Sequence, residues 1–580
     1  MHRKKPVLYT VAVLLLFLTI IKLTTPSSDL SVDSAFQTFT DTLFCQELSS
    51  NTLNLHYTLK NPENFSIDQD NVSLGNFEVS NLESAASLEN CLAALDTFSY
   101  EHLSSENQLT YDILKYYLET ALDGTPYLLY EEPLSPLTGT QSQFPVLLSE
   151  YPFYTEKDIQ TYLSLLEKVP AYFDSLITFE QAKSDAGLFM PPYSAENVME
   201  ECESFITLKT SNYLYSSFEN RINTLQNLSP EKRKEYITQN SYAIETFIFP
   251  SYRKLINALN TLKNHSNNTG NLCNYTNGTS YYEYLVQTQT CSDKTIKEIQ
   301  QLTLSQVKED LTILQHTVSE GNFSAESNSF ILEDSSPEAI LQTLKAKTET
   351  LFPNAPDIKL SIKYVPQEME EYLSPAFYMI PAIDNIETNV IYINQGHIPE
   401  TLDLFTTLAH EGYPGHLYQT TYFGSSDPAP IRSLLDFGGY TEGWALYTEM
   451  LSYYFTDLPK EEATFLQRNS SIILGLYTLA DIGIHYEGWT LMDTISFFRQ
   501  YGITNTDTIQ SIYELIIGDP ANYLKYYIGY LEFLELKKYA MKQWGDAFSQ
   551  KLFHKTVLDI GPAPFPVIKN RISQLNLQNS

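Results

Sequence analysis

The chain has 580 residues, with 36 Lys and Arg against 70 Asp and Glu, which gives a formal net charge of -34. Proteins that bind nucleic acids present basic surface to the phosphates, so this charge disfavours that class of function. Hydrophobic residues make up 43% of the chain and aromatic residues 13%. This composition can bury a large core and excludes a chain that is disordered throughout.

The N-terminus resembles an export signal. Positions 2–5 are basic, residues 6–21 are uncharged and largely apolar, and Lys22 closes the segment. The apolar segment is shorter than the ~20 residues that a spanning helix needs. We favour an uncleaved anchor with its basic end inside, so that residues 1–33 form an anchor and a short linker. A cleaved signal peptide is the alternative, and the lack of a Cys directly after the apolar segment disfavours a lipoprotein anchor.

The remainder of the chain has the hydrophobic periodicity of helices. The predicted helices cover 158–179, 295–317, 336–351 and most of 402–550. The predicted strands are 357–365 and 389–394. The second is the richer in β-branched residues. We therefore expect a mainly α fold with a small β-sheet. We divide it into an N-terminal helical half, 34–350, and a C-terminal half with the functional motifs, 351–580.

The chain contains five cysteines. An exported protein can form disulfides, because its compartment is oxidising. Cys273 and Cys291 flank a stretch rich in Gly, Asn and Tyr and are the best candidate pair, since a bridge between them closes a short loop. The alternative is that all five thiols are free.

One segment combines two histidines with an adjacent glutamate: His410, Glu411 and His416. Zinc peptidases commonly place two His four residues apart on one helix face, with a Glu beside them as the general base. Here the spacing is six residues, which on a regular helix is about 240° of rotation and would point the imidazoles apart. Two glycines and a proline lie between the histidines and can break the helix. The residues alone leave both outcomes open.

Further candidate groups follow downstream. Glu442 and Glu449 are seven residues apart and share a helix face. A turn and an antiparallel helix would return Glu442 to a two-His site as a third ligand, which is a catalytic zinc set. His485 and Tyr526 are candidate donors to the oxyanion that a peptide hydrolase must stabilise.

These motifs resemble the bacterial family labelled domain of unknown function 885, which is itself similar to gluzincin zinc peptidases such as thimet oligopeptidase and angiotensin-converting enzyme. The family's pattern is His-Glu-x-x-Pro-Gly-His, then Glu-Gly-Trp-Ala-Leu-Tyr-x-Glu, Gly-x-His and Tyr-Lys-x-Gly. The matching residues are His410, Glu411, Pro414, Gly415, His416, Glu442–Tyr447, Glu449, Gly483, His485, Tyr526 and Gly529. The likeness runs from about residue 34 to the C-terminus.

The resemblance implies a helical metallopeptidase-like fold whose small sheet lies beside an active-site cleft. It implies that His410, His416 and Glu442 hold Zn²⁺, or another divalent ion that such a ligand set accepts. Glu411 is then the general base that activates a water, and Glu449 orients a ligating histidine. The implied roles of His485 and Tyr526 are to stabilise the oxyanion or to contact the substrate. The substrate is expected to be a short peptide, paired by β-addition with strand 389–394.

The chain departs from the family pattern at Tyr527, where the family has Lys, although Lys525 is near. This departure and the stretched histidine spacing motivate an alternative from another class, a peptide-binding protein of the same fold without turnover. A metal-dependent amidase acting on cell-wall peptides is a further alternative. We expect a single-pass cell-membrane protein with an extracellular catalytic domain, in contact with the membrane through its N-terminal segment only, or a secreted protein if the signal is cleaved.

Overall fold

The computed structural model describes residues 31–575 apart from 137, 320–329, 331, 366, 368–369, 371–373 and 398–400. The fold is mainly helical with one small sheet, as the sequence predicts. The predicted anchor or signal segment lies almost wholly outside the described residues. Within the described part of the chain, every helix is too short or too polar to cross a bilayer.

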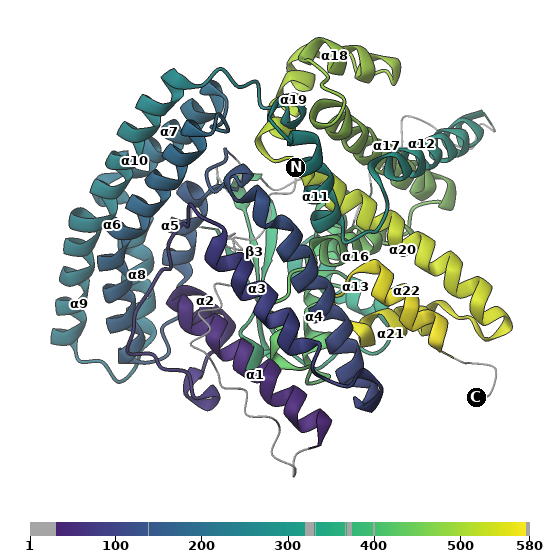
Figure 1. Ribbon diagram of the computed structural model, residues 1–580. Helices are drawn as coiled ribbons and strands as arrows, with labels where there is room; N and C mark the ends of the chain where they lie inside the picture. The colour runs from purple at the N-terminus through teal and green to yellow at the C-terminus, as the bar shows by residue number, and fades with distance from the viewer. Residues whose placement is uncertain are drawn as a thin grey trace.

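The first helices of the described chain lie side by side at the centre and bottom of Figure 1. They are α1 (Val32–Ser50), α2 (Thr52–Thr58), α3 (Leu82–Leu95) and α4 (Ser105–Gly124). A second group forms a helical lobe with its own hydrophobic core (Figure 1). Its helices are α5 (Thr140–Glu150), α6 (Glu156–Asp185), α7 (Pro192–Thr207), α8 (Tyr213–Thr224), α9 (Pro230–Ala243) and α10 (Phe249–Leu262).

The lobe follows from amphipathic helices with defined ends. In α10 the residues Tyr252, Leu255 and Leu259 recur at helix-face spacing, and all three are buried. At the start of α6, Thr155 and Asp158 form a capping box that satisfies free backbone N–H groups. The observed α6 contains the predicted helix 158–179.

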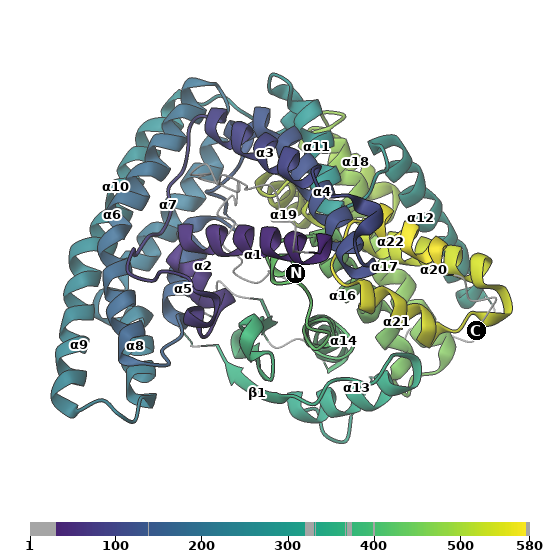
Figure 2. The ribbon, with the colours of Figure 1, turned by 60° about the horizontal axis from the view of Figure 1, so that its bottom comes forward.

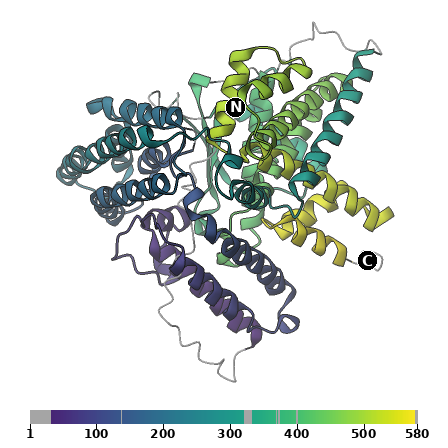
Figure 3. The same ribbon diagram turned by 45° about the horizontal axis from the view of Figure 1, so that its top comes forward.

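The remaining helices form the third group. Three precede the sheet: α11 (Gly278–Thr290), α12 (Ile296–Ser319) and α13 (Pro337–Leu351). The others follow it: α14 (Thr401–Glu411), α15 (His416–Gly424), α16 (Gly438–Ser452), α17 (Lys460–His485), α18 (Leu491–Gln500), α19 (Thr506–Gly518), α20 (Asn522–Trp544), α21 (Gln550–Ile560) and α22 (Phe565–Gln574). Figure 3 shows the three groups meeting around the strands.

The largest core joins the first group to the third. It includes Phe36 and Phe44 of α1 together with Trp444 of α16 and Phe533 of α20. Figure 2 shows α1 running from the lobe across to the C-terminal helices. This core includes residues from both sides of residue 350. The division into halves at that point stays a prediction.

The sheet has the strand order β1–β3–β2. Its strands are β1 (Lys359–Tyr364), β2 (Ala376–Met379) and β3 (Thr388–Ile393). β3 pairs parallel with β1, Lys359 opposite Thr388, and antiparallel with β2, Ala376 opposite Ile393. The expectation that strand 389–394 pairs with a peptide is therefore wrong, because both edges of β3 are already paired. β2 lies at an edge of the sheet instead.

Helices α16 and α20 approach each other closely at glycines. A Cβ on Gly443 would lie 2.4 Å from the carbonyl carbon of Gly529, and one on Gly529 would lie 2.1 Å from the carbonyl oxygen of Gly439. Only glycine permits this contact between two helix backbones. The contact holds α16, which carries Glu442, against α20, which carries Tyr526.

The predicted disulfide is wrong, since Cys273 and Cys291 are both free thiols. The Cys273 thiol points at the carbonyl oxygen of Ile484, at 3.9 Å, and the Cys291 thiol donates to the carbonyl oxygen of Thr288 at 3.5 Å. The structure thus matches the alternative of five free cysteines.

Candidate metal centre

The chain between the two motif histidines is a break between helices. α14 ends at Glu411 and α15 begins at His416, with a cis peptide bond before Pro414. A Cβ on Gly415 would lie 1.8 Å from the carbonyl oxygen of His410, so only glycine fits there. The indole N–H of Trp444 donates to the carbonyl oxygen of Pro414 at 2.9 Å and ties the turn to α16. The six-residue spacing that misplaces a ligand on a regular helix is thereby bridged by a turn.

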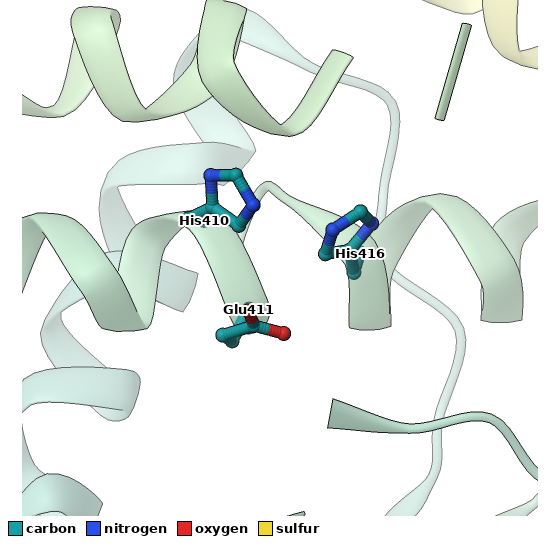
Figure 4. A group of neighbouring side chains, drawn as sticks. All are labelled: His410, Glu411 and His416. Carbon is teal, nitrogen blue, oxygen red and sulfur yellow. The ribbon is translucent and has the colours of Figure 1, made fainter. Parts of the chain in front are cut away.

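The turn brings the two imidazoles together (Figure 4). Their ring centroids are 4.9 Å apart, with 79° between the ring planes. One ligand atom from each of His410, Glu411 and His416 lies within 4.8 Å of the others, and all three side chains are buried. In Figure 4, His410 and Glu411 lie at the end of one helix, His416 opens the next, and the Glu411 side chain lies beneath the two imidazoles.

Helix α16 adds Glu442 to this group. Its Oε2 is 3.3 Å from Nε2 of His416 and 3.6 Å from Nε2 of His410. Zinc ligands bond at about 2.0–2.1 Å in tetrahedral geometry, which places neighbouring ligand atoms about 3.3 Å apart. Two imidazole nitrogens and one carboxylate at these separations suit a divalent metal such as zinc. The donor set fits the ion that the sequence predicts.

Glu449 lies two turns further along the same face of α16. Its Oε2 is 2.8 Å from Nδ1 of His410. A carboxylate on Nδ1 fixes the ring and leaves Nε2 toward the metal position, the usual arrangement behind a ligating histidine. Burial alone would lower the pKa of His410, but the hydrogen bonds to Glu442 and Glu449 outweigh it and raise that pKa to about 10.

Glu411 is held from the opposite side by the sheet. The backbone N–H of Tyr378 in β2 donates to its Oε2 at 2.8 Å. This bond fixes one carboxylate oxygen beside the histidines. Tyr526 also reaches the group, since its ring lies over that of His410 with centroids 6.3 Å apart and 29° between the planes.

A cavity of about 1030 Å³ lies beside this centre and is lined by residues from all three groups of helices, although none of the centre's own side chains is among the described lining residues. Its lining includes Tyr378, whose backbone N–H donates to Glu411. It also includes Thr441 and Lys525, which directly precede Glu442 and Tyr526 in the sequence. Tyr527, which replaces the family lysine, is fully buried and hydrogen-bonds through its hydroxyl to Ser471 at 3.3 Å. Lys525 is thus the basic side chain of this motif that meets the cavity.

His485 does not join the centre, and the prediction that it is catalytic is wrong. It is fully buried, and both ring nitrogens are engaged by backbone. The N–H of Leu272 donates to Nδ1 at 3.4 Å, and Nε2 donates to the carbonyl oxygen of Ile516 at 3.0 Å. Burial lowers its pKa to about 4. His485 is a structural residue that joins α17 to α19 and to the segment before α11.

The family profile described as "Bacterial protein of unknown function (DUF885)" matches residues 78–572, most of the chain. The chain belongs to this family. No curated protein matches this chain.

Two solved structures have a fold similar to that of this chain. One, described as "the putative lipoprotein from Colwellia psychrerythraea", has a TM-score of 0.82 at 18% identity and covers 93% of this chain and 98% of its own. Another, "a putative lipoprotein of unknown function from Shewanella oneidensis", has a TM-score of 0.63 at 16% identity and covers 92% of this chain and 99% of its own. At these identities the similarity shows the fold.

Two contacts that build the candidate centre escape sequence reasoning. The Tyr378 contact is made by backbone, so the residue type carries no signal, and β2 has only four residues. Trp444 is part of the matched motif and is expected to pack. The structure adds that its indole N–H holds the turn between the histidines.

Proposed function

We propose that this protein is an extracytoplasmic, zinc-dependent peptidase that hydrolyses short peptides. One observation carries the proposal. The Nε2 atoms of His410 and His416 converge on one carboxylate oxygen of Glu442, with Glu449 behind His410 and Glu411 in the same group. The likeness of these motifs to gluzincin peptidases agrees with that chemistry.

In this proposal His410, His416 and Glu442 hold the ion. When bound, a divalent ion supplies Lewis acidity, which activates a nearby water and polarises a carbonyl. Glu411 takes the proton from the attacking water and passes it to the leaving amine. The Tyr378 N–H keeps the Glu411 carboxylate in position throughout. Tyr526 donates from its hydroxyl to the oxyanion as the carbonyl becomes tetrahedral.

The cavity supports short peptides as the substrate class. A volume of about 1030 Å³ admits a peptide of a few residues and excludes a folded domain. Phe377, Tyr378, Met379 and Ile380 line it, so a bound peptide lies alongside β2, one of the two edge strands, rather than β3.

The proposed location outside the cytoplasm is supported from two directions. The basic and then apolar start of the chain has the composition of an export signal. The two proteins of the same fold are both described as putative lipoproteins.

The test is mass-spectrometric product analysis of a mixed peptide library incubated with the full chain, with and without a chelator. The proposal expects cleavage that the chelator abolishes and added Zn²⁺ restores. Cleavage that is indifferent to chelation contradicts it. A folded chain that leaves all peptides intact also contradicts it and favours the binding protein or the cell-wall amidase, for which peptidoglycan fragments are the next substrate.

A further inference from the structure

A group of aromatic and acidic side chains lines the cavity apart from the candidate metal centre. It combines four tyrosines and two glutamates, and we call it the tyrosine–glutamate pocket. Its members are Tyr127 and Tyr130 of η3 (Thr125–Tyr130), Glu131, Glu132, and Tyr281 and Tyr284 of α11. All six residues line the cavity.

The four rings form one continuous aromatic surface. The ring centroid of Tyr127 is 5.5 Å from that of Tyr284, with 29° between the ring planes, and 5.6 Å from that of Tyr281. The ring centroids of Tyr130 and Tyr281 are 4.9 Å apart. The faces of tyrosine rings carry negative potential and attract cations, and a cage of such rings is a recurring way to hold an ammonium group.

The carboxylates beside the rings exceed the cations that could neutralise them. Lys183 is fully buried, its Nζ is 2.7 Å from Oε2 of Glu132, and it also donates to the carbonyl oxygen of Glu131. Glu180, one turn earlier on α6, is fully buried and interacts with both Lys183 and Glu132. One ammonium thus lies among three acidic side chains.

The carboxyl group of Glu180 is incompletely satisfied in this cluster. Both of its carboxylate oxygens are buried without a hydrogen-bond partner among the described residues. Burial raises the pKa of Glu131 and that of Glu180 to about 8, even though Lys183 lowers both. At pH 7 these two carboxyl groups therefore hold a proton most of the time, and an added cation beside them would favour their ionised form.

The cavity as a whole is lined by more acidic than basic side chains. The carboxylates among its described lining residues are Glu47, Glu131, Glu132, Asp384, Asp427, Asp436 and Asp519, and the cations are Arg432 and Lys525. Low-dielectric walls of one charge sign concentrate ligands of the opposite charge. The cavity therefore favours a cationic ligand.

We propose that the tyrosine–glutamate pocket binds a primary ammonium group of the ligand, with the ammonium over the tyrosine rings and paired with Glu131 and Glu132. Two parts of a peptide supply this chemistry, the free N-terminus and a lysine side chain. The identification of the ligand as a peptide rests on the proposed function, whereas the recognition of an ammonium group does not.

The experiment measures peptide binding in the Glu411→Gln variant of the full chain, so that turnover does not interfere. Calorimetry compares four forms of one short peptide with a single internal lysine: unmodified, N-terminally acetylated, lysine-acetylated and doubly acetylated. The unmodified form is expected to bind at least tenfold tighter than the doubly acetylated form. The two singly acetylated forms show whether the N-terminus or the lysine supplies the ammonium.

Variants assign the preference to the pocket. Glu131→Gln with Glu132→Gln is expected to remove the preference while leaving affinity for the doubly acetylated peptide unchanged. Tyr127→Leu keeps the charges of the pocket and is expected to reduce the preference for the unmodified peptide. The matched control removes two carboxylates from other parts of the cavity wall, Glu47→Gln with Asp427→Asn, and is expected to keep most of the preference. Circular dichroism checks that each variant is folded.

Several outcomes overturn the inference. They are equal binding of all four peptide forms, no binding of any form, a preference that survives the Glu131 and Glu132 substitutions, or a preference lost equally in the matched control. A chain that prefers the unmodified peptide yet cleaves none supports the inference and contradicts the proposed function. Chelator-sensitive cleavage without any ammonium preference does the reverse.

Discussion

His410 and His485 are both buried imidazoles in the last turn of a helix, and their partners give them opposite chemistry. His410 faces the carboxylates of Glu442 and Glu449, at 3.6 and 2.8 Å. His485 faces only backbone at the equivalent atoms, the N–H of Leu272 and the carbonyl of Ile516. The pKa of the first is raised to about 10 and that of the second is lowered to about 4.

The difference teaches that motif membership does not define a role. Both histidines match a family pattern, and burial is nearly equal, with 2% of His410 and none of His485 exposed. Carboxylate partners prepare an imidazole to hold a cation, because they supply negative charge and fix the ring. Backbone partners on both nitrogens fix the neutral form and leave no atom for a ligand.

The sharpest way to break this comparison is to remove one histidine from each region. His416→Ala is expected to lose the bound metal entirely and with it all turnover, because one carboxylate and one imidazole bind too weakly. His485→Gln is expected to keep one equivalent of metal. Metal content after dialysis, measured by plasma mass spectrometry, checks both. Equal loss in the two variants, or a full equivalent in His416→Ala, contradicts the assignment.

The next effect separates metal binding from proton transfer. Glu411→Gln keeps the shape of the side chain and removes its basicity, so we expect kcat to fall about 10²–10⁴-fold while metal content is unchanged. Steady-state cleavage of a peptide from the library gives kcat. A variant with the activity of the parent would falsify Glu411 as the base, and a variant without metal would show that it is a ligand instead.

A smaller effect, on metal affinity, is expected from Glu449, the carboxylate that contacts Nδ1 of His410. Glu449→Gln leaves Nδ1 of His410 with a neutral partner, so metal affinity should fall about 10- to 100-fold. Competition with a chromophoric zinc chelator measures this affinity. Thr448→Ser, the neighbouring change on α16, is the control and should bind metal like the parent. An unchanged affinity in Glu449→Gln would show that its contact with His410 is structural only.

The smallest effect concerns the stability of the fold and tests the neutral, buried state of His485. The pKa of His485 is about 4 in the fold and about 6.5 in an unfolded chain. As pH falls from 7 to 5 the unfolded state gains a proton that the folded state does not, so this residue costs about 2 kcal/mol of stability over that interval. Urea denaturation at both pH values should show a shallower decline for His485→Gln than for the parent. Parallel declines would contradict the neutral, buried state of His485.

Much of the fold could be predicted from the sequence, since local periodicity decides it. The helix predicted over 336–351 is α13 (Pro337–Leu351), and the strand predicted over 389–394 is β3 (Thr388–Ile393). β2 was not predicted, because four residues are too few for an alternating pattern. Its position at the sheet edge moves the expected peptide contact from β3 to β2.

The site was predictable in its residue types and not in its partners. Whether His416 returns to His410 depends on the room at Gly415 and on the Trp444 bond to the turn, which are contacts between distant parts of the chain. The role of His485 depends likewise on Leu272 and Ile516, which no motif contains. The Cys273–Cys291 pair looked suitable by spacing, yet the two thiols have different neighbours in the fold.

The most direct test of the metal centre is anomalous diffraction at the zinc edge from crystals of the purified, zinc-loaded protein. We expect one strong peak about 2.0–2.1 Å from Nε2 of His410 and of His416, with a Glu442 oxygen at a similar distance. A zinc-loaded crystal with no peak between these three side chains, or with its peak elsewhere, would contradict the account.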